Sequence, residues 1–274
     1  MASAIFDGYL CSAEYLLYGP APYAEVMNLA RDLRRTAERS GARRAAAFAR
    51  ALTGEAALLS GHLDLAAAEL TRATALHRDL ESAAGEAHSL QRLAEVRVAQ
   101  GDTAAARRLL ARALPLARAS MVAKHLLHRV FGTMIRAAAG PDEARGVVDR
   151  ADSTLGWDDF CQFCSIMLAV PAAIACARAG DLPAARRQLA IAERTAIVWR
   201  GTAWEAGLDE AHAAVAMASG DLGAARARLR AAAKQFRRTG QPLDAERCRR
   251  ELSRTGSGGA GREGVARRPA AIAS

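Results

Sequence analysis

Residues 101–113 read GDTAAARRLLARA, and the same pattern returns as GDLPAARRQLAIA at residues 180–192 and as GDLGAARARLRAA at residues 220–232. The three copies align without a gap. Each has a small residue five and twelve positions after its glycine, with a leucine nine positions after it. Such self-similarity at a fixed period is typical of helical repeat proteins. The wider ladder of glycines, spaced by 42, 40, 39, 40 and 40 residues, consists of Gly19, Gly61, Gly101, Gly140, Gly180 and Gly220.

Each copy predicts a corner between two helices. A glycine after a helix ends that helix in the left-handed conformation, and the aspartate after it can cap the first N–H groups of the next helix. The two small residues and the leucine then fall on one face of the second helix, where alanine permits close approach to a neighbour. One helix pair cannot bury its apolar face alone, so neighbouring pairs must stack. We therefore expect an all-α fold, a right-handed α-solenoid of about six helix pairs.

Composition agrees with this architecture. The chain has 274 residues, of which 51% are hydrophobic and only 5% aromatic, and alanine makes up about a quarter. The apolar fraction is too high for a disordered chain. Because alanine carries little apolar area and is the best helix former, the core is expected to come from close contact between helices.

The expected compartment is the cytoplasm. A secretory signal would need basic residues before its apolar stretch, and none precedes the first apolar stretch here. Charged residues also interrupt every apolar run long enough for a membrane span. The five cysteines are an odd number in a long chain, which argues against a disulfide framework.

The positive charge is concentrated at one end. The formal net charge is +9. Residues 221–274 hold 13 Lys and Arg against 5 Asp and Glu, a net +8, and the remaining residues hold 25 against 24, a net +1. A nucleic-acid interface along the body is therefore not expected, and any such contact is expected only at the basic end. Its candidate residues are Arg226, Arg228, Arg230, Lys234, Arg237 and Arg238.

The spacing around the corners resembles tetratricopeptide repeats. Leu93-Ala94 stands at the Leu-Gly positions of the first helix, and Ala106, Leu110 and Ala113 stand at the Ala, aromatic and Ala positions of the second. The period of about 40 residues exceeds the usual one of about 34, and alanine and leucine replace the aromatic signature residues.

A more specific resemblance covers residues 1–254. Residues 235–248, QFRRTGQPLDAERC, are similar to the end of the superhelical region of the large ATP-binding LuxR-type regulators of actinobacteria, the relatives of the maltose-regulon activator. That resemblance implies transcriptional regulation through ligand or partner sensing. The chain lacks the Gly-x-x-x-x-Gly-Lys-[Ser/Thr] loop, and no helix-turn-helix follows Leu252. We expect a repeat domain over residues 1–254 and a flexible tail over residues 255–274.

The functional prediction is a non-enzymatic module for protein–protein interaction or ligand sensing, with a protein or peptide partner or a small-molecule effector and without a membrane. Two alternatives stay open, namely a regulator that contacts nucleic acid through its basic end and a truncated LuxR-type regulator without its DNA-binding domain. No motif for a catalytic nucleophile, metalloprotease helix or triad occurs, so an enzyme is not expected.

In tetratricopeptide-like arrays the first helix of each repeat lines the concave groove. Transferring that register predicts a groove that is polar at one end and apolar in its middle. Packing of these residues against neighbouring helices is the alternative. The predicted groove residues are Phe48, Glu55, His88, Gln91, Glu95, Met167, Val170, Ile174 and Glu210.

A metal site is a separate hypothesis. Cys161 and Cys164 are expected early in the first helix of the fifth repeat, on one face. A shift by 40 residues places Cys164 opposite position 124, one residue from His125. The cysteine pair could therefore face His125 and His128 across neighbouring helices, and the two pairs could supply the four ligands of a zinc site. The alternative is a pair of buried cysteines beside solvated histidines. No other cofactor is predicted.

Aromatic residues concentrate near two junctions. Trp157, Phe160 and Phe163 lie at the entry to the fifth repeat's first helix, and Trp199 and Trp204 lie at the next junction. They could form a ligand-facing patch, or they could fill the junction over small-residue helices.

Overall fold

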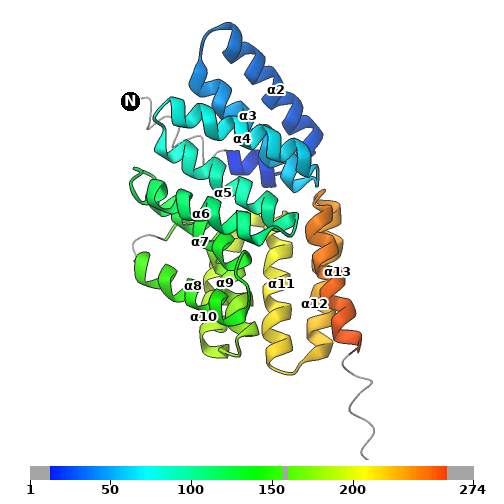
Figure 1. The fold of residues 1–274 in the computed structure, drawn as a ribbon. Coiled ribbons are helices and arrows are strands. Elements are labelled where there is room, and N and C mark those ends of the chain that lie inside the picture. The colour runs from blue at the N-terminus through cyan, green and yellow to red at the C-terminus, as the bar shows by residue number, and fades with distance from the viewer. Residues whose placement is uncertain (1–12, 157–159, 258–274) are drawn as a thin grey trace, which may run out of the picture.

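A computed structural model describes residues 13–156 and 160–257 of the chain (Figure 1). Residues 13–18 are helical, and no β-strand occurs within these two ranges. The even-numbered helices are α2 (Tyr23–Arg39), α4 (Leu63–Asp79), α6 (Thr103–Arg118), α8 (Pro141–Thr154), α10 (Leu182–Ala196) and α12 (Leu222–Arg238). The odd-numbered helices are α3 (Arg43–Leu59), α5 (Ala83–Ala99), α7 (Ala123–Arg136), α9 (Ile166–Arg178), α11 (Ala203–Ala218) and α13 (Pro242–Ser257), and a short 3-10 helix, η2 (Ile197–Trp199), precedes α11.

The helices form two layers. Each helix from α2 to α13 packs against the next one along the chain. The odd-numbered helices also contact one another in the order α3, α5, α7, α9, α11 and so form an inner layer, with the even-numbered helices outside it. This is an all-helical array of consecutive pairs, consistent with an α-solenoid. None of the helices between residues 13 and 257 that the structure describes is long and apolar enough to cross a membrane.

The predicted corners are confirmed where the glycine-aspartate pattern is strongest. Gly101, Gly180 and Gly220 have φ values of 83°, 79° and 84°. Each following aspartate accepts a hydrogen bond from a backbone N–H three residues on, at 2.9, 3.0 and 2.8 Å. The small residues and leucines at the repeated offsets are all buried, namely Ala106, Leu110, Ala113, Ala185, Leu189, Ala192, Ala225, Leu229 and Ala232. These residues pack the outer helices onto the inner layer.

The structure adds a second set of corners that the 40-residue ladder did not include. Gly41, Gly201 and Gly240 are left-handed as well, with φ values of 69°, 77° and 76°, and Glu81 takes the same conformation with a φ of 52°. Gly140 departs from the ladder because its φ of −166° is extended, and α8 begins with a proline directly after it. Left-handed residues therefore end helices both within and between repeats.

The two halves of the array meet where α7 touches α9. A Cβ atom on Gly132 would lie only 2.1 Å from the carbonyl oxygen of Met167. Only a residue without a side chain permits this approach of the two backbones.

The last helix returns to the first repeats. The amide Nε2 of Gln241 donates a hydrogen bond to the Tyr23 hydroxyl at 2.6 Å, across 218 residues of chain. A Cβ atom on Gly61 would lie 3.2 Å from Cγ of Pro242, so the start of α13 rests against the corner between α3 and α4 (Figure 1). Helix α13 continues to Ser257, three residues beyond the expected domain end at residue 254. Residues 258–274, most of the expected tail, lie outside the described residues.

Candidate functional site

A cavity of about 580 Å³ lies between the inner helices α5, α7, α9 and α11 and the returning helix α13. This volume is typical of small-molecule sites. Its lining includes Gln91, Arg92, Glu95, Arg129, Thr133, Met167, Val170, Ile174, Trp204, Glu210, Phe236, Gln241, Asp244 and Arg247.

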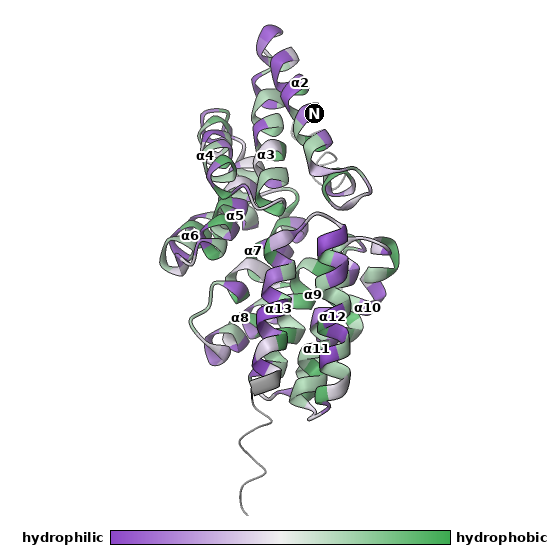
Figure 2. Cartoon of the chain, turned by 90° about the vertical axis from the view of Figure 1, so that its right-hand side faces the viewer, coloured by the Kyte–Doolittle hydropathy of each residue, from purple (hydrophilic) through white to green (hydrophobic). Residues whose placement is uncertain are grey.

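One wall of the cavity is apolar. It consists of Met167, Val170 and Ile174 from α9 with the Trp204 ring from α11 and Phe236 from the end of α12. Figure 2 shows α9 and α11 coloured mostly as hydrophobic, whereas α13 is mostly hydrophilic. This wall can hold the apolar body of a ligand.

The wall formed by α5 and α7 is polar and internally bonded. The amide Nε2 of Gln91 donates a hydrogen bond to Oγ1 of Thr133 at 2.8 Å. The Thr133 hydroxyl in turn donates a hydrogen bond to Oε1 of Glu95 at 3.2 Å.

A buried ionic cluster forms part of this wall and extends behind it. We define it as Glu14, Glu55, Arg92, Glu95 and Arg129. Arg92 donates from Nε to Glu55 at 2.7 Å, from Nη1 to Glu95 at 2.8 Å and from Nη2 to Glu14 at 3.3 Å. Arg129 also donates to Glu14. The cluster connects residues 13–18, α3, α5 and α7. Such a cluster is stable only while each charge keeps its partners, because the interior disfavours an unpaired ion.

The cluster shifts the titration of its members. Burial raises the pKa of Glu55 to about 7, although Arg92 opposes the shift. Burial alone would also raise the pKa of Glu95, but Arg92 and Arg136 together lower it. Burial, followed by the charges of Arg129 and Arg92, holds the pKa of His88 well below its usual value. His88 Nε2 lies 3.2 Å from a Glu55 oxygen, outside hydrogen-bond geometry.

Three polar atoms of lining residues have no hydrogen-bond partner among the described residues, and one of them is Nε of Arg129. The other two are the indole Nε1–H of Trp204 and the amide Oε1 of Gln91. Trp204 is 8% exposed and Gln91 1% exposed. Both atoms are covered by their neighbours, so a molecule in the cavity would reach them only after a rotation of the Trp204 or Gln91 side chain. Buried polar groups are rarely left without partners.

The α13 side of the cavity carries a second ion-pair group. Arg247 binds Glu210 of α11 through two hydrogen bonds at 2.8 and 2.7 Å, and it also pairs with Asp244. This fork-shaped pairing fixes α13 against α11.

The structure places the sequence-predicted groove residues in two groups. Gln91, Glu95, Met167, Val170, Ile174 and Glu210 line the cavity. The other three do not line the cavity. Glu55 belongs to the buried ionic cluster, His88 is buried next to Glu55, and Phe48 is half-buried against the hydrophobic core.

Sequence reasoning missed the residues that organise the polar wall. Arg92, Arg129 and Glu14 were not among the candidates. One pattern could have indicated the cluster, because Glu14, Glu55 and Glu95 follow one another at 41 and 40 residues and so occupy one repeat position. Three acids at one inward position require buried cations nearby.

The aromatic residues divide between the two uses considered. Trp204 lines the cavity, whereas Trp199 is 1% exposed and fills the junction, with its ring centroid 5.8 Å from that of Tyr15 and 6.1 Å from that of Phe163. Phe160 is exposed beneath the Arg194 guanidinium, 5.3 Å from ring centroid to Cζ. Trp157 lies outside the described residues.

The basic-end residues lie on α12, and two of them are engaged. Arg226 donates to the carbonyl oxygen of Thr255, and Arg228 pairs with Asp209 at 2.6 Å. The side chains of the other four are exposed, namely Arg230, Lys234, Arg237 and Arg238.

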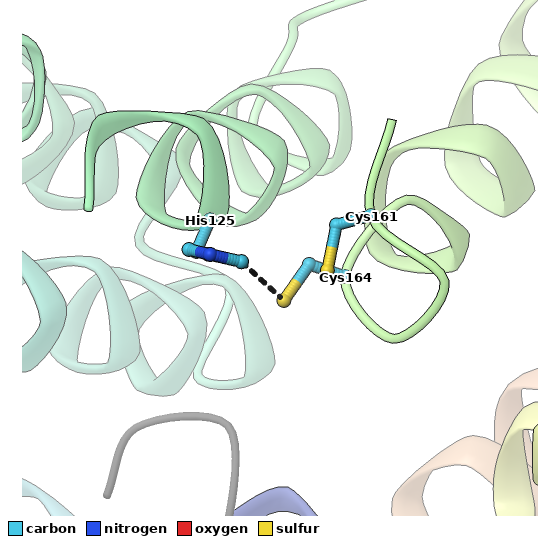
Figure 3. Close-up of side chains that lie close together, drawn as sticks. All are labelled: His125, Cys161 and Cys164. Carbon is cyan, nitrogen blue, oxygen red and sulfur yellow. Dashed lines mark hydrogen bonds between the residues drawn. The ribbon is translucent and has the colours of Figure 1, made fainter. Parts of the chain in front are cut away.

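The candidate metal ligands divide as well. His125, Cys161 and Cys164 come together beside α7 (Figure 3). Cys161 and Cys164 lie in the turn that precedes α9 rather than in the helix. Hydrogen bonds to Cys161 and Cys164 raise the pKa of His125 to about 9. His128 points elsewhere, with Nδ1 at 2.5 Å from the Lys124 carbonyl oxygen and Nε2 at 3.2 Å from the Ser165 hydroxyl.

No protein-family model matches this chain, and no curated protein matches it.

Proposed function

We propose that the chain is a non-enzymatic, tetratricopeptide-like sensor that binds a small organic molecule in its central cavity. The observation that carries the proposal is an apolar wall beside lining residues with unpartnered polar atoms, of which Trp204 Nε1 and Gln91 Oε1 are the two that the test addresses. The expected ligand has an apolar body, an acceptor for the indole N–H and a donor for the amide oxygen.

The closure of the array favours a small molecule over a long peptide. The contact between Tyr23 and Gln241 joins the start of α2 to the residue before α13, and α13 contributes a wall of the cavity together with α5. An extended peptide or a partner helix needs an open groove. Transcriptional regulation as the biological role rests on the resemblance to LuxR-type regulators alone.

The test uses 1-anilinonaphthalene-8-sulfonate as a probe, because it joins an aromatic body to sulfonate acceptors. We expect saturable one-to-one binding, weakened about 3- to 10-fold in Trp204→Phe, since the variant keeps an aromatic side chain and loses the indole N–H donor. Trp199→Phe is the matched control and is expected to bind as the wild type does. Non-saturable binding, or equal weakening in both variants, would contradict the proposal. Native mass spectrometry of gently purified protein then searches for a co-purifying ligand.

A second candidate function is contact with nucleic acid through α12. The observation that favours it is the exposure of Arg230, Lys234, Arg237 and Arg238 on one helix. This contact would be sequence-independent and would weaken steeply with salt. Retention on DNA-cellulose at low salt that is lost in the Arg237→Ala/Arg238→Ala variant would support it, and equal retention of both proteins would refute it.

A further inference from the structure

Three metal-binding side chains meet at the edge of the fold, apart from the cavity. His125 lies in the first turn of α7, and Cys161 and Cys164 come from the turn before α9. One ligand atom of each lies within 4.8 Å of the others (Figure 3). No other group of three such side chains comes together in the described part of the chain.

The distances suit a tetrahedral metal. Zinc–sulfur bonds of about 2.3 Å and zinc–nitrogen bonds of about 2.0–2.1 Å place neighbouring sulfur and nitrogen atoms about 3.5–3.6 Å apart. The Cys164 sulfur and the His125 Nδ1 are 3.5 Å apart.

The local backbone holds the cysteine turn in place without metal. The backbone N–H of Cys161 donates to the Ser165 hydroxyl at 3.0 Å, and the N–H of Ser165 donates to the Cys161 carbonyl oxygen at 3.0 Å. Arg129 adds a contact from Nη2 to the Cys164 sulfur at 3.8 Å. Outer contacts of this kind orient metal ligands.

The remaining described cysteines have different surroundings. Cys176 and Cys248 are fully buried within hydrophobic clusters, which is the common placement for a cysteine that only packs. Cys161 and Cys164 face an imidazole instead, and His125 is only half-buried. The soft thiolate and imidazole donors select zinc over magnesium or calcium.

We propose that His125, Cys161 and Cys164 form a zinc site with three protein ligands and a fourth position for water or another ligand. This set is narrower than the four residues that the sequence suggested, because His128 is engaged with Lys124 and Ser165. The site is independent of the ligand proposed for the cavity.

The experiment measures metal on the full chain. After dialysis against excess zinc and then against buffer, elemental analysis is expected to find about one zinc per chain. Titration with Co²⁺ is expected to produce thiolate-to-cobalt charge-transfer absorption and the intense visible bands of four-coordinate cobalt. Less than half an equivalent of zinc, or cobalt spectra without the charge-transfer band, would overturn the proposal.

Four variants separate this site from general effects on folding. Cys164→Ala and His125→Gln are each expected to weaken zinc binding about 10-fold or more. Cys176→Ala and His128→Gln are the matched controls and are expected to retain about one zinc with unchanged cobalt spectra. Circular dichroism checks that every variant is helical. Equal loss of zinc in Cys176→Ala and Cys164→Ala would refute the site, and loss of zinc in His128→Gln would refute the three-ligand assignment.

Discussion

The inner walls on α5 and α7 and on α9 and α11 differ in chemistry although their outer helices are alike. Helices α6 and α10 both bury Ala, Leu and Ala at the same offsets from their corners. The first wall nevertheless buries charges around Arg92, and the second buries Met167, Val170 and Trp204. The outer residues therefore build the repeat, and the inner residues, which do not repeat, give each part of the cavity its own chemistry.

Removing Arg92, the centre of the buried ionic cluster, should have the largest effect on stability. Arg92→Met leaves Glu14, Glu55 and Glu95 without their shared cation. We expect the free energy of unfolding to fall by about 3–5 kcal/mol, because unpaired buried charges are strongly unfavourable. Urea denaturation followed by circular dichroism measures the change. The exposed Arg230→Met on α12 is the control, with an expected change below about 0.5 kcal/mol. Similar changes in both variants would mean that Arg92 in the buried ionic cluster contributes no more to the free energy of unfolding than an exposed arginine.

The junction between the two walls should be the next most sensitive place. Gly132→Ala puts a methyl group against the Met167 carbonyl oxygen, and we expect a loss of about 1–3 kcal/mol from forced separation of α7 and α9. Gly146→Ala is the matched control, since nothing lies within 4 Å of its added Cβ in α8. It should stabilise the protein by up to about 1 kcal/mol through helix propensity. A lower melting temperature for Gly132→Ala and a higher one for Gly146→Ala would support the close approach of α7 and α9. Two stabilising substitutions would contradict it.

The smallest expected effect is a pH dependence of stability that arises from Glu55 in the buried ionic cluster. The pKa of Glu55 is raised from 4.5 to about 7 in the folded chain. The folded state therefore binds this proton more tightly, and this group's contribution to the free energy of unfolding decreases as pH rises from about 4.5 to 7. Glu55→Gln removes that contribution. The stability of the variant relative to the wild type should thus increase over this range, by on the order of 1 kcal/mol.

Urea denaturation at half-unit steps of pH measures this difference. Glu25→Gln in the first turn of α2 is exposed and serves as the control. Parallel stability curves for wild type and Glu55→Gln would show that Glu55 titrates in the folded chain as it does in the unfolded one.

The parts of the fold that could be predicted are those that depend on nearby residues. A corner and its buried face lie within thirteen residues, as in Gly101 to Ala113, so local rules are enough. The contact between Tyr23 and Gln241 depends instead on the small rotation that every repeat adds. No local sequence pattern encodes the total rotation that these repeats add up to.

The candidate site was likewise predictable only where its residues follow the repeat. The inward register brought Gln91, Met167 and Glu210 to the lining because it follows from the repeat. Arg92 and Arg129 are 37 residues apart, off the period, and reach the cluster through long flexible side chains. Side-chain reach of this kind is fixed only by the packed structure.

The hydrogen bond between Tyr23 and Gln241 changes how the array can open. In an open stack of repeats each end frays by itself, because a repeat contacts only its neighbours. Here, loosening of α2 or of α13 breaks the same contact. The first and last repeats are therefore coupled, because opening at either end breaks a contact that also holds the other end.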